Sequence, residues 1–181
     1  GYARLKFVKN EITNNSAFYN ITLDTESTNN KLIELISSIK INVKDGTDNS
    51  LYKSFSIEST EMEHFKAGNI YNLDINNLSS NHNYYFEIVT YVKLGSKTHE
   101  LTTLFNVKDF TTLKVDAIVQ IVNKFTTENL IDFDVRIEDP DGAISSDKVY
   151  LEARDRTGNL VYVDELRINY EYQRITIDKL D

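Results

Sequence analysis

The chain contains no cysteine and no tryptophan, and its 181 residues include only one proline. Without cysteine there are no disulfides, no thiolate nucleophile and no cysteine-based zinc site. No run approaches the 18 or more apolar residues, roughly, of a membrane-spanning helix. The sequence begins Gly-Tyr-Ala, without an initiator Met or a signal-peptide pattern. We therefore expect it to be a processed or excised piece.

Positive charge is also scarce. The chain has 20 Lys and Arg against 28 Asp and Glu, which gives a net charge of −8 and a pI of about 4.9. Its basic residues are scattered, and a net acidic surface argues against binding to a nucleic-acid backbone. The bias toward Asn, Ile and Lys, with so little Pro and Trp, indicates an AT-rich genome. We expect a low-GC bacterium or one of its phages as the source.

What the chain does have is alternation of apolar and polar residues, which predicts strands with one buried face. In the first half this pattern covers Leu5–Phe7, Tyr19–Leu23, Ile39–Val43, Leu51–Ile57, Leu73–Ile75 and Tyr84–Ile88. The second half repeats the order at Val119–Ile121, Phe133–Ile137, Val149–Ala153, Val161–Val163 and Ile175–Ile177. The sequence therefore predicts an all-β fold with an internal repeat.

Further signals repeat as well. Leu51 matches Val161 at the offset that relates Ile39 to Val149, and the Ile75–Leu78 segment matches Ile177-Asp-Lys-Leu180. We place the boundary near Leu113, which predicts domains at 1–113 and 114–181. The join has no Gly, Pro or Ser run, so we expect a fairly stiff tandem.

Two stretches depart from the strand pattern. Residues 29–39 carry apolar residues at helical spacing with an Asn available as a cap, and Thr60-Glu-Met-Glu63 fits a capping box. Each is predicted to form one helical turn within a loop.

The most specific local motif is Leu78-Ser-Ser-Asn-His-Asn-Tyr84, followed by Tyr-Phe-Glu-Ile. A leucine closes one strand and a tyrosine opens the next, which is typical of a tyrosine corner, where the phenol bonds to backbone upstream. With Leu73-Asp-Ile75 before it, this segment resembles strands E and F of a fibronectin type III domain. The related immunoglobulin-like sandwiches stay open, because the chain lacks the family's usual core Trp and its junction prolines.

The resemblance implies tandem Greek-key β-sandwich domains. The second domain is then incomplete, because Leu180 stands where Leu78 does and nothing corresponds to strands F and G. Truncation of the chain explains this most simply. The alternatives are that another chain supplies the missing strands by β-augmentation, or that a smaller sheet is complete as it stands.

Catalytic signals are weak. His64, His82 and His99 lie in polar contexts that favour exposed side chains, and no nucleophile or phosphate-loop motif occurs. The Glu138-Asp-Pro-Asp-Gly142 segment, with Asp147 nearby, has some character of a calcium loop, but it fits an ordinary turn better. We predict no enzyme activity, no cofactor and no metal.

If Tyr84, Phe86, Ile88 and Thr90 point inward, then Tyr85, Glu87, Val89 and Tyr91 point outward. Two tyrosines and a valine make an apolar outer stripe, and aromatic residues are enriched at interfaces. We predict that Tyr85, Val89 and Tyr91 contact a protein partner or neighbouring subunit.

The predicted function is a structural or adhesion spacer of an extracellular bacterial protein, at the cell surface or secreted, or of a phage virion. The alternative is an accessory module of a secreted enzyme that binds carbohydrate.

Overall fold

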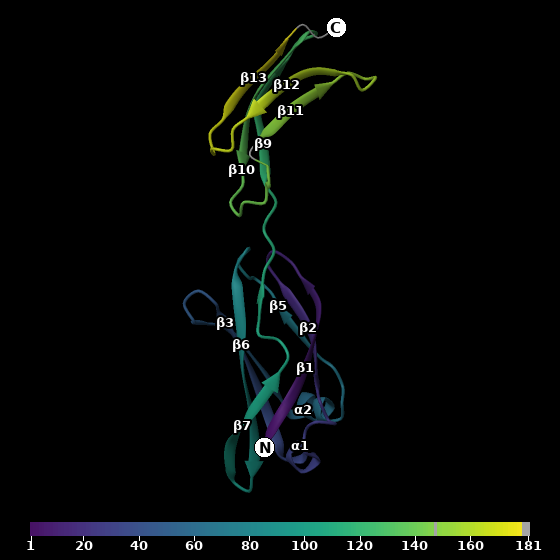
Figure 1. Ribbon diagram of the computed structural model, residues 1–181, viewed down its shortest axis with the longest axis vertical. Coiled ribbons are helices and arrows are strands. Elements are labelled where there is room, and N and C mark those ends of the chain that lie inside the picture. The colour runs from purple at the N-terminus through teal and green to yellow at the C-terminus, as the bar shows by residue number, and fades with distance from the viewer. Residues whose placement is uncertain (147, 179–181) are drawn as a thin grey trace. The chain divides into compact units, whose positions relative to one another are not determined.

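The computed structural model describes residues 1–146 and 148–178 (Figure 1). Thirteen strands and two short helices lie in these residues, so the fold is all-β, as the alternation predicted. The chain divides into two compact units, Gly1–Leu113 and Lys114–Asp181, which are the ranges expected from the sequence. They are called unit 1 and unit 2 below.

Unit 1 contains eight strands and both helices. Its strands are β1 (Tyr2–Ile12), β2 (Ala17–Leu23), β3 (Ile36–Asp45), β4 (Leu51–Glu58), β5 (Tyr71–Ile75), β6 (Asn83–Leu94), β7 (Lys97–Phe105) and β8 (Asp109–Thr111). The hydrogen-bonded order is β4-β3-β6-β7-β1-β2-β5, with β8 also paired to β6. Every described pairing is antiparallel except that of β1 with β7.

Strand β7 joins the two groups of strands because it changes partner along its length. Its first residues, up to Leu101, pair with β6, whereas those from Thr102 onward pair in parallel with β1. Asn106 extends this contact past the end of the strand. Its side chain accepts a hydrogen bond from the Phe7 N–H at 2.7 Å and donates one to the Phe7 carbonyl at 3.1 Å. The start of the unit is thereby fixed to its late strands.

The core of unit 1 is filled from both groups of strands. It contains 21 buried apolar side chains, among them Phe7 of β1, Tyr19 of β2 and Phe86 of β6. The Phe7 ring lies 5.3 Å from Phe86 and 5.8 Å from Tyr19, measured between centroids. Burial raises the pKa of the Tyr19 phenol to about 12, and Asp109 adds to the shift, which marks Tyr19 as a core residue.

The two helices lie in the places that the sequence indicated. Helix α1 (Asn30–Leu35) begins after Asn29, whose side chain accepts from the Lys31 N–H at 2.9 Å. Strand β3 takes over at Ile36, so the helical spacing ends earlier than residue 39. Helix α2 (Ser59–Lys66) has Glu58 as its N-cap and no side-chain capping bond. The predicted capping box is therefore wrong, because the helix starts before Thr60.

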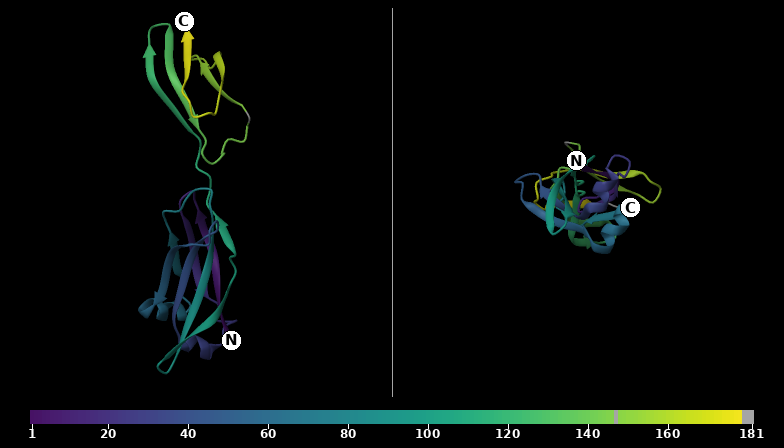
Figure 2. Two further views of the ribbon diagram at one scale, coloured as in Figure 1. Left: turned by 90° about the vertical axis from the view of Figure 1, so that its left-hand side faces the viewer. Right: turned by 90° about the horizontal axis from the view of Figure 1, so that it is seen from below.

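Unit 2 has five strands in its described residues. They are β9 (Ile118–Thr126), β10 (Leu130–Glu138), β11 (Val149–Arg154), β12 (Leu160–Leu166) and β13 (Gln173–Asp178). One sheet has the order β13-β10-β9, and β11 with β12 forms a separate hairpin (Figure 2). The core among these residues consists of six side chains: Phe133, Val135, Ile137, Leu166, Ile175 and Ile177.

The strand registers of the two units correspond. Val119 pairs with Ile137 as Leu5 pairs with Leu23, and Phe133 pairs with Ile175 as Tyr19 pairs with Leu73. The register between β9 and β10 shifts at the position that corresponds to the shift between β1 and β2. The order β9-β10-β13 thus repeats β1-β2-β5, and the hairpin β11-β12 repeats β3-β4.

The match of Leu51 with Val161 that the sequence indicated is wrong by one residue. Lys44 pairs with Leu51, and its counterpart Arg154 pairs with Leu160 rather than Val161. The connection from β11 to β12 is one residue shorter between paired positions, which the turn composition did not reveal. Leu180, expected to match Leu78, lies outside the described residues.

Candidate functional site

The strongest candidate site is the outer face of β6. Tyr84, Phe86, Thr90 and Val92 are buried, whereas Tyr85, Val89 and Tyr91 are partly exposed and Glu87 is exposed. The inward and outward faces therefore follow the alternation in the sequence. Tyr85, Val89 and Tyr91 are called the outer stripe below.

The neighbours of the outer stripe are polar. Lys40 of β3 stands opposite Val89, and Glu100 of β7 stands opposite Tyr91. Between the aromatic residues, Glu87 pairs with Lys44 at 3.6 Å. The face therefore offers a few apolar side chains within a rim of both charge signs. Protein interfaces have this composition, with aromatic contacts surrounded by polar groups.

Asn49, in the turn between β3 and β4, is the partner that sequence reasoning missed. The Tyr85 hydroxyl donates a hydrogen bond to its side-chain oxygen at 3.0 Å. Asn49 also has a positive φ of 62°, which Asn tolerates better than most residues. An Asn in an Asp-Gly-rich turn after a strand was the available signal. The bond fixes one end of the outer stripe.

The tyrosine corner is present in unit 1. Tyr84 is 1% exposed, and its hydroxyl accepts a hydrogen bond from the Ser79 N–H at 3.0 Å. Leu78 is buried beside it, and the Tyr84 ring stacks on Phe110 at 5.6 Å. The Thr112 hydroxyl closes the turn by donating to the Ser79 carbonyl at 2.6 Å. These contacts make Tyr84 a structural residue that orients β6.

His82 differs from the exposed histidine that the sequence indicated. It is half-buried, its ring packs 4.9 Å from Tyr84, and its Nε2 lies 2.9 Å from Asp45 Oδ1. The Thr47 N–H and then this imidazole hold the pKa of Asp45 below its ordinary value. The pair ties the β3–β4 turn to the tyrosine corner.

The carboxylates of the acidic turn in unit 2 accept hydrogen bonds from backbone N–H groups of the same unit. Asp139 accepts hydrogen bonds from the Ala143 and Ile144 N–H groups at 2.7 and 3.0 Å, and Asp141 accepts from the Val115 N–H at 2.8 Å. No group of three or more His, Asp or Glu side chains that could hold a metal lies within residues 1–146 and 148–178. Asp147 lies outside the described residues.

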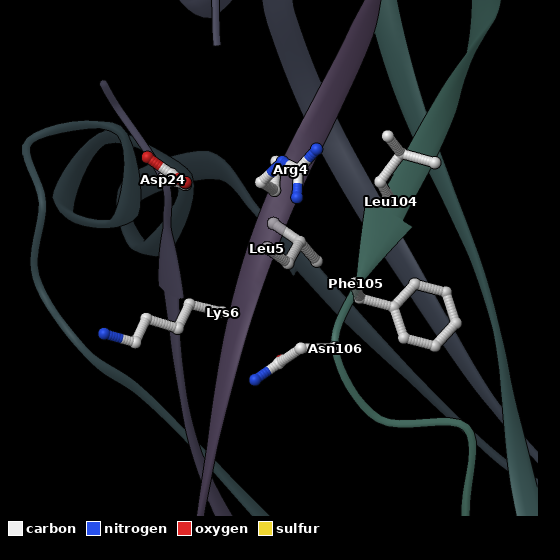
Figure 3. A pocket seen from close by; sticks show the side chains of 7 residues that line it. All are labelled: Arg4, Leu5, Lys6, Asp24, Leu104, Phe105 and Asn106. Atoms are coloured by element: carbon white, nitrogen blue, oxygen red, sulfur yellow. The ribbon is translucent and has the colours of Figure 1, made fainter. Parts of the chain in front are cut away.

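A shallow hollow of about 240 Å³ lies between β1 and the end of β7 (Figure 3). Its lining residues are Arg4, Leu5, Lys6, Asp24, Leu104, Phe105 and Asn106. Asp24 is held by the Glu26 and Ser27 N–H groups at 3.1 Å each, which lower its pKa together with Arg4. Asn106 is bonded to Phe7, as described above. The hydrogen bonds of Asp24 and Asn106 therefore stabilise the local fold.

Comparison with known proteins does not assign a family. No protein-family model matches the chain, and a search of curated proteins finds no significant relative. Across the described ranges, neither helix has the length and apolar character needed to cross a membrane.

Proposed function

We propose that this chain is a non-catalytic structural or adhesion module, a spacer or docking unit of an extracellular bacterial protein or a phage virion. In this proposal it consists of tandem Greek-key β-sandwiches of the fibronectin type III-like or immunoglobulin-like kind, the second incomplete. Its contact surface is the outer stripe of Tyr85, Val89 and Tyr91.

Strand order supports the sandwich. In unit 1, β1, β2 and β5 form one group and β4, β3, β6 and β7 the other. A seven-strand sandwich with strands A, B and E in one sheet and C′, C, F and G in the other has this order. The hydrogen bond from Ser79 to Tyr84 stands where a tyrosine corner belongs, just before the strand equivalent to F.

The observation that carries the proposed contact is that Tyr85, Val89 and Tyr91 lie partly exposed on one face of β6, the longest strand of unit 1. Such side chains could also pack only against their cross-strand neighbours. The neighbours here, Lys40, Ser38 and Glu100, are polar or charged. A partner surface that covers the tyrosines would therefore remove more apolar area from water than the neighbours do.

The test is a pull-down or assembly assay on the double variant Tyr85→Ser and Tyr91→Ser. Association should weaken, while circular dichroism shows an intact fold, because neither side chain belongs to the buried core. A matched control is the pair Tyr150→Ser and Tyr170→Ser, which are exposed tyrosines that belong to unit 2 and not to the stripe. Unchanged association with an intact fold would reject the outer stripe as the contact surface.

The second candidate function is carbohydrate binding in an accessory module of a secreted enzyme. The bond between Tyr85 and Asn49 favours it, because sugars are recognised by an aromatic face together with amide groups. A glycan array separates the two functions. Saturable binding that Tyr85→Ser removes and Tyr150→Ser preserves would favour the carbohydrate module over the protein contact.

A further inference from the structure

A second hollow of unit 1, of about 300 Å³, lies between helix α2 and the start of β5. Glu61 and His64 line it from α2, where they stand three positions apart and so share one face of the helix. Tyr71 lines it from β5. Its apolar wall is made by Phe65 and Ile70. The hollow therefore combines polar and apolar side chains from two elements.

The backbone around this hollow is fixed by contacts within unit 1. Asn69 binds the His64 carbonyl twice, through its backbone N–H at 3.1 Å and its side-chain amide at 3.0 Å. Gly68, with a φ of 96°, makes the turn that follows the helix. Met62 and Phe65 anchor α2 in the core. The hollow therefore needs no ligand to form.

The polar side chains of this hollow differ from those of the hollow beside β1. There, Asp24 and Asn106 are bonded to other groups of unit 1. Here, the Glu61 carboxylate, the His64 imidazole and the Tyr71 hydroxyl form no hydrogen bond or ion pair with any other part of the described chain. A few polar groups that face one hollow with an apolar wall are typical of a ligand site.

The charges around the hollow favour a cation. Burial, and then the charges of Glu61 and Asp74, raise the pKa of the Tyr71 phenol. The phenol is therefore neutral at physiological pH, and its oxygen can accept a hydrogen bond. The C-terminal end of α2 adds the partial negative charge of its carbonyl groups. Lys66 of α2 is already paired, because its ammonium donates to two carbonyl groups at the α1–β3 junction, 3.1 Å from each.

We propose that this hollow binds an alkylammonium group. The ammonium lies against the Glu61 carboxylate and donates hydrogen bonds to the Tyr71 oxygen and to the neutral imidazole of His64. The alkyl chain packs on Phe65 and Ile70. The group comes either from a free aliphatic amine or from a lysine side chain of a partner protein. This inference goes beyond the proposed function, which concerns the outer stripe on β6.

The first probe is n-butylamine, titrated into the full chain and followed by two-dimensional NMR. The pH is held at about 8, where an imidazole is ordinarily neutral and an alkylamine is charged. The amide signals of Asn69, Ile70 and Tyr71 should shift and then saturate. Neither n-butanol, which has the chain without the charge, nor ammonium chloride, which has the charge without the chain, should give a saturable shift.

Two conservative variants make the test specific. Glu61→Gln should weaken the binding of n-butylamine by about fivefold, the upper range for an exposed charge pair. Tyr71→Phe should weaken it by about fivefold as well, through the loss of one hydrogen bond. It should not lower the melting temperature, because that hydroxyl has no partner in the described chain. Glu63→Gln makes the same charge change on α2 but outside the hollow, and should bind as wild type does.

A peptide with one internal lysine and blocked termini separates the two sources. Binding tighter than that of n-butylamine assigns the hollow to a lysine of a partner protein, and weaker binding assigns it to free amines. The proposal is overturned if n-butylamine gives no saturable shift at these amides, or if n-butanol binds as tightly. Equal loss of affinity in Glu61→Gln and Glu63→Gln would show a diffuse attraction by net charge and would overturn it too. Shifts of the same signals on addition of EDTA alone would assign the hollow to a metal ion instead.

Discussion

Leu5 of unit 1 and Val119 of unit 2 stand on equivalent strands, opposite equivalent partners, yet one is buried and the other is more than half exposed. Both lie in segments with the same alternation of apolar and polar residues. The alternation decides which face a side chain occupies. Whether that face is buried from solvent depends on strands far away in sequence, here β6 and β7.

The two units also differ in the contacts that supplement their cores. Unit 1 surrounds Tyr84 and Phe86 with other aromatic rings, including Phe110. Unit 2 instead carries ion pairs on its strands, such as Arg174 with Asp132 and with Asp134. Exposed ion pairs contribute about 0–1 kcal/mol each, so they replace little of the missing apolar burial.

The largest expected effect is the difference between the units when each is expressed alone. Residues 1–113 bury 21 apolar side chains in one core, against six in the described part of residues 114–181. Unit 1 should therefore show a sharp, cooperative thermal transition by calorimetry, and unit 2 should show none. A sharp transition from residues 114–181 in isolation would contradict this comparison.

A pair of alanine variants tests the same difference at single residues. Leu5→Ala should cost about 2–5 kcal/mol of the free energy of unfolding of unit 1, as expected for a buried leucine. Val119→Ala should cost under about 0.5 kcal/mol, because the side chain is mostly exposed. Urea denaturation of the full chain measures both. Similar costs at the two positions would show that β9 is covered in solution.

A smaller effect separates neighbouring tyrosines of β6. Tyr84→Phe should cost about 1–2 kcal/mol, because it leaves the part-buried Ser79 N–H without its acceptor. Tyr85→Phe removes an exposed bond to Asn49 and should cost far less. Equilibrium denaturation of both variants gives the ranking. The reverse order would mean that the inward and outward faces of β6 have been exchanged.

The smallest expected effect is the acid dependence of unit 2. Hydrogen bonds from Arg174 and then Thr176 lower the pKa of Asp132 in the folded chain. Hydrogen bonds from Asn123 and then Arg174 lower the pKa of Asp134. Such groups stabilise the fold above their unfolded pKa of about 3.9, and that stability is lost as the pH falls through the folded values.

The protection of the β10 and β13 amides from hydrogen exchange, measured in the full chain, should therefore fall on acidification below about pH 4. The variant Arg174→Gln should flatten this dependence, whereas Arg156→Gln, an arginine in the β11–β12 turn, serves as the control. An unchanged pH profile in Arg174→Gln would remove the ion cluster as its cause.

Local patterns in the sequence predicted the strands, the boundary near Leu113 and the burial of Tyr84, because alternation and turn residues act over a few positions. They did not predict the parallel pairing of β1 with β7 or the role of Asn106, which join residues about one hundred positions apart. No short-range signal encodes such a pairing.

Similar limits explain the smaller errors. The N-cap of α2 is Glu58 rather than Thr60, and helix ends are the least certain part of a pattern-based prediction. His82 was expected in solvent because Asp45, its partner, is far away in sequence. In the candidate site, the alternation predicted the direction of the outer stripe, but not the bond that holds Tyr85 to Asn49.

The parallel contact between β1 and β7 also affects how unit 1 responds to pulling. Once the short strand β8 has detached, tension along the chain draws β1 toward its start and β7 toward its end. In parallel strands these forces load the hydrogen bonds in shear, so the rungs from Tyr2 to Leu5 must break together. The two bonds from Asn106 to Phe7 add to them. Resistance to force is set by the rate of unfolding, so it need not follow thermal stability.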